Sequence, residues 1–349
     1  MDMEDRRPYL GSLKQLFRAD EYRLVGGTGD GMRMFHVHNG AEMEFVCSVD
    51  RCMDLHYLRC KGYNLGFLTG VGDVAPQYYD DRNLGWMKSF TAGFMTTCGL
   101  QTTGLPSCYE GRDRGLHGRI SNCPAEEAGI QVCEEHDGAS VQLRGVMREY
   151  YPTGENLTLT RTIRAALEDR TIRIRDVVRN QGYRRELHMM LYHFNLGYPL
   201  LSERTQLLIP AWETLPRDRD AAEHPTAWRE MAPPTQGLPE MCYYHRLRAG
   251  EDGRTLVAAF NPDIGVGVAI RFDRRALDRL VQWRQLTAGY YAMGLEPCNA
   301  TIDGVEDAIQ NGSAKFLDPG EEAVYELEIE LITDRERFEA LEAESARYQ

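Results

Sequence analysis

Apolar and polar residues alternate with a period of two along most of the chain. The sequence YELEIEL, residues 325–331, sets four apolar side chains against three glutamates. The segments 156–163 and 171–178 follow the same rule. Successive side chains of a strand point to opposite faces of a sheet, so each pattern predicts a strand with one buried and one wet face. The short interval 168–170 predicts that the strands at 156–163 and 171–178 form a hairpin.

Further strand pairs are predicted from end to end. MRMFHVH and AEMEFVCSV flank Asn39-Gly40, a pair typical of type I′ hairpin turns. LVAAF and VGVAIRF flank residues 261–265. Helical patterns are scarce, and we expect helices only around 10–19, 274–280 and 334–349. Because strands and helices do not alternate regularly, the pattern favours stacked antiparallel sheets over a parallel α/β fold.

One segment interrupts the strand pattern. Residues 210–239 are rich in Pro, Asp, Glu and Arg, and alternation resumes after them. We therefore expect a single domain over residues 1–349, with a long loop at about 210–239. Loops of this length are often functional.

Composition limits the class of partner and the compartment. The 349 residues carry a net charge of −13, which argues against nucleic-acid and anionic-membrane partners but not against a neutral ligand. Nine cysteines without CxxC spacing indicate reduced thiols. The first residues lack a signal-peptide core, and no apolar run approaches the roughly 18 residues that span a bilayer. We expect a cytoplasmic protein.

Two histidine segments are candidates for chemistry. LHMMLYHFNLGYPLL places His188 and His193 five residues apart, so in a strand they point to opposite faces. Either could be an ordinary core histidine, and His193 is the better functional candidate because it leads into Asn195 and Gly197. In RGLHGRISN, glycines flank Leu116-His117, and this segment reads either as a ligand-contacting loop or as a turn with an incidental histidine.

An acid in YYAMGLEPCNA is the third candidate. Pro297 has no backbone donor, so we expect the strand to end near Leu295 and Glu296 to lie at the rim of a sheet. Glu296 is then either a solvent-facing residue or a catalytic base. Familiar nucleophile, phosphate and dinucleotide motifs are missing, and the His36/His38 pair lacks further ligands. We expect no metal or other cofactor.

The order of motifs resembles the galactose mutarotase, or aldose 1-epimerase, superfamily. LHGR, HFNLGYP, GLEPCNA and KFLDPGEEAVYELEIEL carry this resemblance across most of the chain. DRCMDL, FTAGFMTTCGLQTTG, LYHFNLGYPLL and MGLEP look like an aldose 1-epimerase-like branch. The resemblance implies an all-β chain folded as one large antiparallel β-sandwich with a few short helices.

The resemblance also implies roles for individual residues. Glu296 matches the catalytic base and His193 the general acid, although His193 directly precedes Phe194, two residues later than in better-known relatives. A two-residue shift keeps the face of a strand. No residue clearly matches the sugar-contacting aspartate of those relatives. The implied substrate-binding residues are His117, Arg119, Arg51, Glu240 and Trp283.

The implied activity interconverts the anomers of a sugar. A base removes the C1 hydroxyl proton while an acid protonates the ring oxygen, and the ring opens. After rotation about the C1–C2 bond, both transfers reverse and the ring closes on the other face. Proximity would favour an ionised Glu296 and a protonated His193. The partner is then a small carbohydrate, and the chain a monomer or homodimer. Another sugar epimerase, an aldose-ketose isomerase or a non-catalytic carbohydrate-binding protein stays open.

Overall fold

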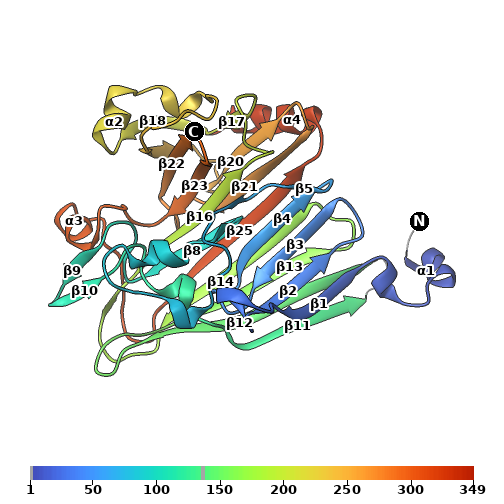
Figure 1. Ribbon diagram of the computed structural model, residues 1–349, viewed down its shortest axis with the longest axis horizontal. Helices are drawn as coiled ribbons and strands as arrows, with labels where there is room; N and C mark the ends of the chain where they lie inside the picture. The colour runs from blue at the N-terminus through green and yellow to red at the C-terminus, as the bar shows by residue number, and fades with distance from the viewer. Residues whose placement is uncertain (1–2, 135–137) are drawn as a thin grey trace.

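The longest alternating segments form one antiparallel sheet of eight strands. The computed structural model describes residues 3–134 and 138–349 (Figure 1). The strand order in this sheet is β11-β12-β13-β14-β25-β21-β20-β17. The strands are β11 (Glu126–Glu134), β12 (Ala139–Tyr150), β13 (Asn156–Ala166), β14 (Thr171–Asn180), β17 (Gln206–Leu208), β20 (Arg254–Asn261), β21 (Val266–Asp273) and β25 (Glu322–Ile332).

Two further sheets carry most of the remaining strands. The six-stranded sheet has the order β18-β19-β22-β23-β16-β8, and the five-stranded sheet runs from β1 to β5 in chain order. The six strands are β8 (Met95–Leu100), β16 (Met189–Gly197), β18 (Ala211–Pro216), β19 (Met241–Leu247), β22 (Arg279–Thr287) and β23 (Tyr290–Cys298). The five are β1 (Arg18–Arg23), β2 (Arg33–His38), β3 (Met43–Ser48), β4 (Asp54–Cys60) and β5 (Tyr63–Asn64).

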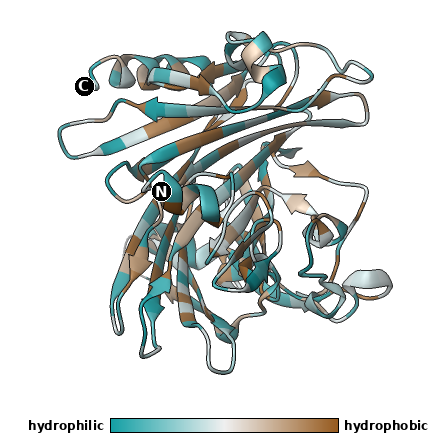
Figure 2. Cartoon of the chain, turned by 90° about the vertical axis from the view of Figure 1, so that its left-hand side faces the viewer, coloured by the Kyte–Doolittle hydropathy of each residue, from teal (hydrophilic) through white to brown (hydrophobic). Residues whose placement is uncertain are grey.

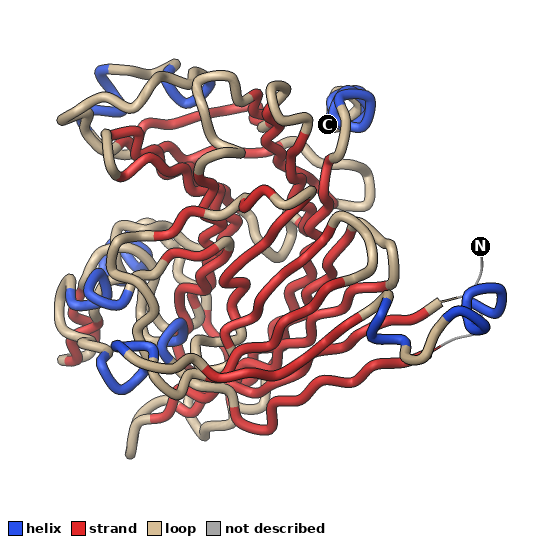
Figure 3. Tube along the Cα trace, turned by 45° about the vertical axis from the view of Figure 1, so that its right-hand side comes forward, coloured by secondary structure: helices blue, strands red, loops and turns tan. Residues whose placement is uncertain are grey.

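Short ribbons and helices lie around these sheets (Figure 3). The two-stranded ribbons pair β6 (Phe67–Leu68) with β7 (Ala92–Gly93), β9 (Ser107–Tyr109) with β10 (Arg112–Arg114), and β15 (Glu186–Leu187) with β24 (Phe316–Leu317). The α-helices are α1 (Met3–Arg6), α2 (Arg219–Glu223), α3 (Val305–Gln310) and α4 (Arg335–Ser345). Single 3-10 turns are η1 (Arg7–Tyr9), η2 (Leu13–Gln15), η3 (Gly27–Gly29), η4 (Pro76–Tyr78), η5 (Gly85–Ser89), η6 (Ile120–Asn122) and η7 (Ala227–Arg229).

The sheets pack as a two-layer sandwich. One continuous core contains Phe45 of β3, Leu143 of β12 and Phe194 of β16, one from each of the large sheets. The five- and six-stranded sheets meet between β4 and β7–β8, where the Phe94 N–H donates to the Leu55 carbonyl (2.9 Å). Figure 2 shows apolar and polar residues alternating along the strands. The expected all-β antiparallel sandwich is confirmed.

A buried ion network joins all three sheets inside this core. The Arg161 guanidinium on β13 donates to Asp176 on β14 (2.9 and 2.6 Å), to Asp54 on β4 (2.8 Å) and to the Thr97 hydroxyl on β8 (2.9 Å). The Tyr192 hydroxyl on β16 donates to Asp176 (2.7 Å). The Arg161 and Asp176 side chains have no solvent exposure. The network therefore determines how the two layers register.

Most of the strand and hairpin predictions are confirmed, but several details are wrong. The predicted helix over 274–280 is a turn followed by β22, and 10–19 holds only η2 and the start of β1. The Asn39-Gly40 hairpin exists, but four residues separate β2 from β3 and only Gly40 has a positive φ. The expected loop 210–239 includes strand β18 and helix α2. The helix expected in 334–349 is α4.

Pro297 does not end its strand. β23 continues to Cys298 between β22 and β16, with Pro297 opposite Leu280. Proline costs one ladder hydrogen bond here because it has no N–H. Glu296 therefore lies within a central strand and not at its rim. No helix among the described residues is long and apolar enough to cross a membrane.

Removing the central guanidinium tests the network. We expect Arg161→Met to lower the free energy of unfolding by about 3–5 kcal/mol, because it leaves two buried carboxyl groups without a positive partner. Urea unfolding measures the change. The control is Arg219→Met, whose side chain is 89% exposed beside Glu223 and whose loss costs less than about 1 kcal/mol. Equal, small losses in the two variants would contradict a structural role for the network.

Candidate active site

His193 and Glu296 lie side by side on neighbouring strands. β16 and β23 pair antiparallel at Leu191↔Cys298 and at Phe194↔Leu295, and this register sets His193 opposite Glu296. The His193 Nε2 lies 3.1 Å from the Glu296 Oε1, and both side chains are almost fully buried. The two residues therefore share one face of the six-stranded sheet. His188 points elsewhere, and its Nε2 lies 2.6 Å from the Tyr325 hydroxyl.

Gly294 makes room for the Glu296 carboxylate. It lies two residues earlier on β23, on the same face of the strand. A Cβ at this position would lie 2.3 Å from the Glu296 Oε1 and 3.1 Å from the His193 Cε1. Only glycine therefore lets the carboxylate take its place beside the imidazole.

Aromatic side chains enclose this pair in a cavity of about 130 Å³. The His193 ring lies 5.4 Å from the Trp283 ring of β22 and 5.7 Å from the Phe90 ring, which follows η5. Tyr290 of β23 and Trp86 of η5 also line the cavity. Because drug-sized ligands occupy roughly 300–1,000 Å³, a volume this small suits a single ring.

His117 approaches the pair from a loop. Its φ is +59°, and its ring centroid lies 5.8 Å from that of His193. The Gly104 N–H donates to the His117 Nδ1 (3.3 Å). Burial lowers the pKa of His117 to about 4, and the positive charge of Arg217 adds to the shift. The ring is therefore neutral at pH 7 with its proton on Nε2, where it can donate a hydrogen bond.

Burial sets the protonation of the central pair. It raises the pKa of Glu296 well above its ordinary value, with help from the Glu240 charge and against that of Arg217. It lowers the pKa of His193 well below its ordinary value, and the nearby His117 lowers it further. Burial thus opposes the expected fully charged pair. In either arrangement, protonated Glu296 with neutral His193 or the reverse, the coupled pair holds one proton.

The pair keeps unused hydrogen-bonding capacity. Among the described residues, the buried His193 Nδ1 and Glu296 Oε1 have no partner with hydrogen-bond geometry. Buried polar atoms are nearly always satisfied by protein or by another molecule. A ligand with adjacent oxygen atoms would satisfy the pair.

Comparison with known proteins places this geometry in a family. The model of a family described as a domain of unknown function, DUF4432, matches residues 29–331. The chain belongs to the DUF4432 family. No curated protein sequence matches it.

Solved structures share the fold of this DUF4432 chain. A proposed aldose 1-epimerase from Klebsiella pneumoniae has a TM-score of 0.91 at 26% identity, covering 95% of this chain and 88% of that one. A galactose mutarotase-like protein from Clostridium acetobutylicum has a TM-score of 0.62 at 12% identity, covering 91% and 99%. Galactose 1-epimerase from Lactobacillus acidophilus has a TM-score of 0.57 at 12% identity, covering 91% and 100%. The last two likenesses concern the fold alone.

Five of the seven predicted site residues of the DUF4432 chain line one cavity. They are His117, His193, Glu240, Trp283 and Glu296. The Trp283 Nε1 donates to the Glu240 carboxylate (2.9 Å), so these two side chains hold each other. The sequence did not point to Arg217, which lines the same cavity and pairs with Asp303 (2.7 Å). Arg217 lies just after β18, in the segment interpreted as a loop.

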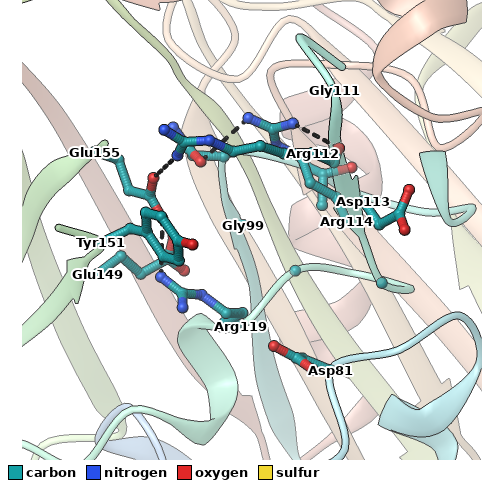
Figure 4. A pocket seen from close by; sticks show the side chains of 14 residues that line it. Asp81, Gly99, Gly111, Arg112, Asp113, Arg114, Arg119, Glu149, Tyr151 and Glu155 are labelled. Atoms are coloured by element: carbon teal, nitrogen blue, oxygen red, sulfur yellow. Dashed lines mark hydrogen bonds and ion pairs between the residues drawn. The ribbon is translucent and has the colours of Figure 1, made fainter. Parts of the chain in front are cut away.

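Arg51 and Arg119 lie outside the cavity. The buried Arg51 guanidinium donates to the carbonyls of Ser121 (2.7 Å), Val74 (2.8 Å) and Ser89 (2.9 Å). It thus fastens η5, which carries Trp86. Arg119 belongs to a neighbouring cleft, shown in Figure 4. Neither residue is placed to contact a sugar held by His193 and Glu296.

A single methyl group tests the role of Gly294. In Gly294→Ala we expect the Glu296 carboxylate to move away from His193, beyond the 4 Å of an ion pair, because a flexible side-chain end yields before the backbone. The free energy of unfolding should change by less than about 1 kcal/mol. A crystal structure and urea unfolding measure both effects. An unmoved carboxylate in a well-folded variant would contradict this account of the site.

Proposed function

We propose that this protein is a mutarotase-type carbohydrate epimerase, with Glu296 as base and His193 as acid. The observation that carries the proposal is the His193–Glu296 pair, 3.1 Å apart on the floor of a cavity with aromatic walls. The fold shared with the proposed aldose 1-epimerase from Klebsiella pneumoniae supports a sugar as the substrate.

The spacing of the pair suits oxygen atoms on the same carbon. In a pyranose the C1 hydroxyl and the ring oxygen are both bonded to C1, so one adjacent acid and base can reach both. Glu296 takes the hydroxyl proton while His193 gives its proton to the ring oxygen, and the C1–ring oxygen bond breaks. Rotation about C1–C2 and reversal of both transfers give the other anomer.

The buried environment opposes the charged starting arrangement of the pair and favours the arrangement that follows ring opening. Ring opening converts ionised Glu296 and protonated His193 into protonated Glu296 and neutral His193. Burial favours the second arrangement, since it raises the pKa of Glu296 and lowers that of His193. The open-chain state thus gains stabilisation, and ring closure restores the first arrangement. No proton is gained from or lost to solvent during the cycle.

The surrounding residues are proposed to hold the sugar. The neutral His117 can donate its Nε2 proton to a hydroxyl, and Glu240 can accept from one. The face of Trp283 can pack against the C–H groups of the ring. Arg217 is proposed to contact a hydroxyl at the mouth of the cavity, where Asp303 orients it.

Removing either proton carrier tests the mechanism. We expect Glu296→Gln and His193→Gln each to lower kcat about a hundred-fold or more, because a positioned acid or base contributes at least that much. Polarimetry on freshly dissolved α-aldoses across a sugar panel measures the rate. The matched controls are Glu326→Gln, on the exposed face of β25, and His188→Gln, which precedes β16 and faces away from the cavity. Both should keep wild-type rates per folded molecule.

Two outcomes would overturn parts of the proposal. If every sugar anomerises in the presence of the wild-type protein no faster than in buffer alone, the proposed mutarotase activity is overturned. If Glu296→Gln turns over as fast as wild type, Glu296 is not the base. Saturable sugar binding by calorimetry without turnover of any bound sugar would instead indicate a carbohydrate-binding protein.

A further inference from the structure

A second and larger cavity lies behind the wall that carries His117. Its volume is about 310 Å³, at the lower end of the roughly 300–1,000 Å³ of small-molecule sites. The segment Gly115–Arg119 separates the two cavities: Leu116 and His117 line the first, whereas Gly115, Gly118 and Arg119 line the second. Figure 4 shows the second cavity between the β9–β10 ribbon and the end of β12. We name it the arginine cleft, after Arg112, Arg114 and Arg119.

Glu155 holds two of these arginines in place. Its carboxylate, with a side chain 7% exposed, accepts from Arg112 (2.6 Å) and from Arg119 (3.0 Å). The Arg112 guanidinium also lies 4.8 Å from the centre of the Tyr151 ring. At Gly154 a Cβ would lie 2.4 Å from the Arg112 guanidinium, so the absence of a side chain there makes room for it. The cleft is therefore preorganised and not a chance gap between mobile side chains.

Several polar groups in the cleft lack a full set of partners. Among the described residues, the buried Arg114 Nε and Thr102 Oγ1 have no hydrogen-bond partner. The Glu149 side chain is buried and accepts one hydrogen bond, from the Leu100 N–H (3.1 Å). Burial raises the pKa of Glu149 to about 7, against the positive charge of Arg119. Such groups need a polar ligand or water to satisfy them.

The balance of charge selects the class of ligand. Three arginines face four acidic side chains, which are Asp81, Asp113, Glu149 and Glu155. The cleft therefore offers little net attraction to an anion or a cation. A hydroxyl group both donates and accepts hydrogen bonds, so a hydroxyl-rich neutral molecule can satisfy guanidinium and carboxyl groups together.

We infer that the arginine cleft is a second binding site, for a neutral hydroxyl-rich molecule such as a sugar, and that it is coupled to the His193–Glu296 cavity through the segment Gly115–Arg119. Two backbone hydrogen bonds tie this segment to its neighbours: the Gly99 N–H donates to the His117 carbonyl (3.0 Å), and the His117 N–H donates to the Gly104 carbonyl (2.9 Å). A ligand that holds Arg119 therefore biases the position of His117. The coupling rests on the proposed function, whereas binding in the cleft does not.

Binding stoichiometry tests the cleft. The probes are neutral monosaccharides and disaccharides, with a sugar phosphate and a uronic acid as anionic comparisons, measured by calorimetry on the full chain. We expect two sites per chain for at least one neutral sugar. Arg114→Met should weaken one site about ten-fold or more, because a charged hydrogen-bond donor is lost, and should leave the other. His193→Gln should show the reverse pattern.

Controls separate binding from folding. The control variant is Arg148→Met. Arg148 lies one residue before Glu149 and faces outward on β12, so this variant should keep both sites. Thr102→Val is nearly isosteric and should also weaken the cleft site. It replaces Arg114→Met in this test if that variant folds poorly. Circular dichroism checks each variant.

Three results would overturn the inference. One is a single site that His193→Gln removes and Arg114→Met leaves unchanged, and another is no saturable binding of any neutral sugar. The third is cleft binding by the anionic probes alone, which would assign a different ligand class. The coupling is tested separately, by the KM for anomerisation with and without a neutral disaccharide that binds the cleft: the disaccharide should shift the KM of the wild-type chain and not that of Arg114→Met, and an unchanged KM in the wild-type chain would remove the coupling. Because calorimetry detects binding in the cleft without turnover, a failed mutarotase assay would not overturn the cleft site.

Discussion

The buried guanidinium of Arg161 is the interaction on which the arrangement of this protein depends. It lies buried between two aspartates, so none of the three groups can lose its partners without leaving a charge in an apolar surrounding. From β13 its contacts reach β4, β8 and β14, and Asp176 extends them to Tyr192 on β16. A shift of either layer would break several of these bonds at once. The network therefore specifies one packing of the sandwich.

The candidate site is built on the other face of the strands that this network holds. Tyr192 points into the core, and the next residue, His193, points into the cavity. Thr97 bonds Arg161, and its neighbour Thr96 pairs with His193 across β8 and β16. A rigid floor explains how a buried carboxyl group and a buried imidazole can stay 3.1 Å apart. Burial of the two groups costs free energy. It also raises the pKa of Glu296 and lowers that of His193, which favours transfer of a proton to Glu296.

The sequence predicted the sheets well and the site in part, for different physical reasons. Alternation of apolar and polar residues indicates which face of a strand is buried, so β13, β14 and β25 could be predicted from the sequence. Motif resemblance brought His193 and Glu296 together, but nothing local showed that Pro297 could sit in a central strand, because a ladder can lose one bond there. Arg51 was assigned to the site by resemblance alone, and no local pattern marked Arg217 among the other arginines. Only tertiary packing turns one toward three carbonyl groups and the other toward a cavity, and the arginine cleft likewise joins segments distant in sequence.

The central claim is that one sugar contacts His193 and Glu296 at the same time. A crystal structure of the wild-type chain with a bound aldose tests it most directly. The account predicts the C1 hydroxyl within hydrogen-bond distance, about 2.6–3.2 Å, of the Glu296 carboxylate and the ring oxygen at a similar distance from the His193 Nε2. A sugar seated in the cavity with C1 turned away from both residues would contradict it.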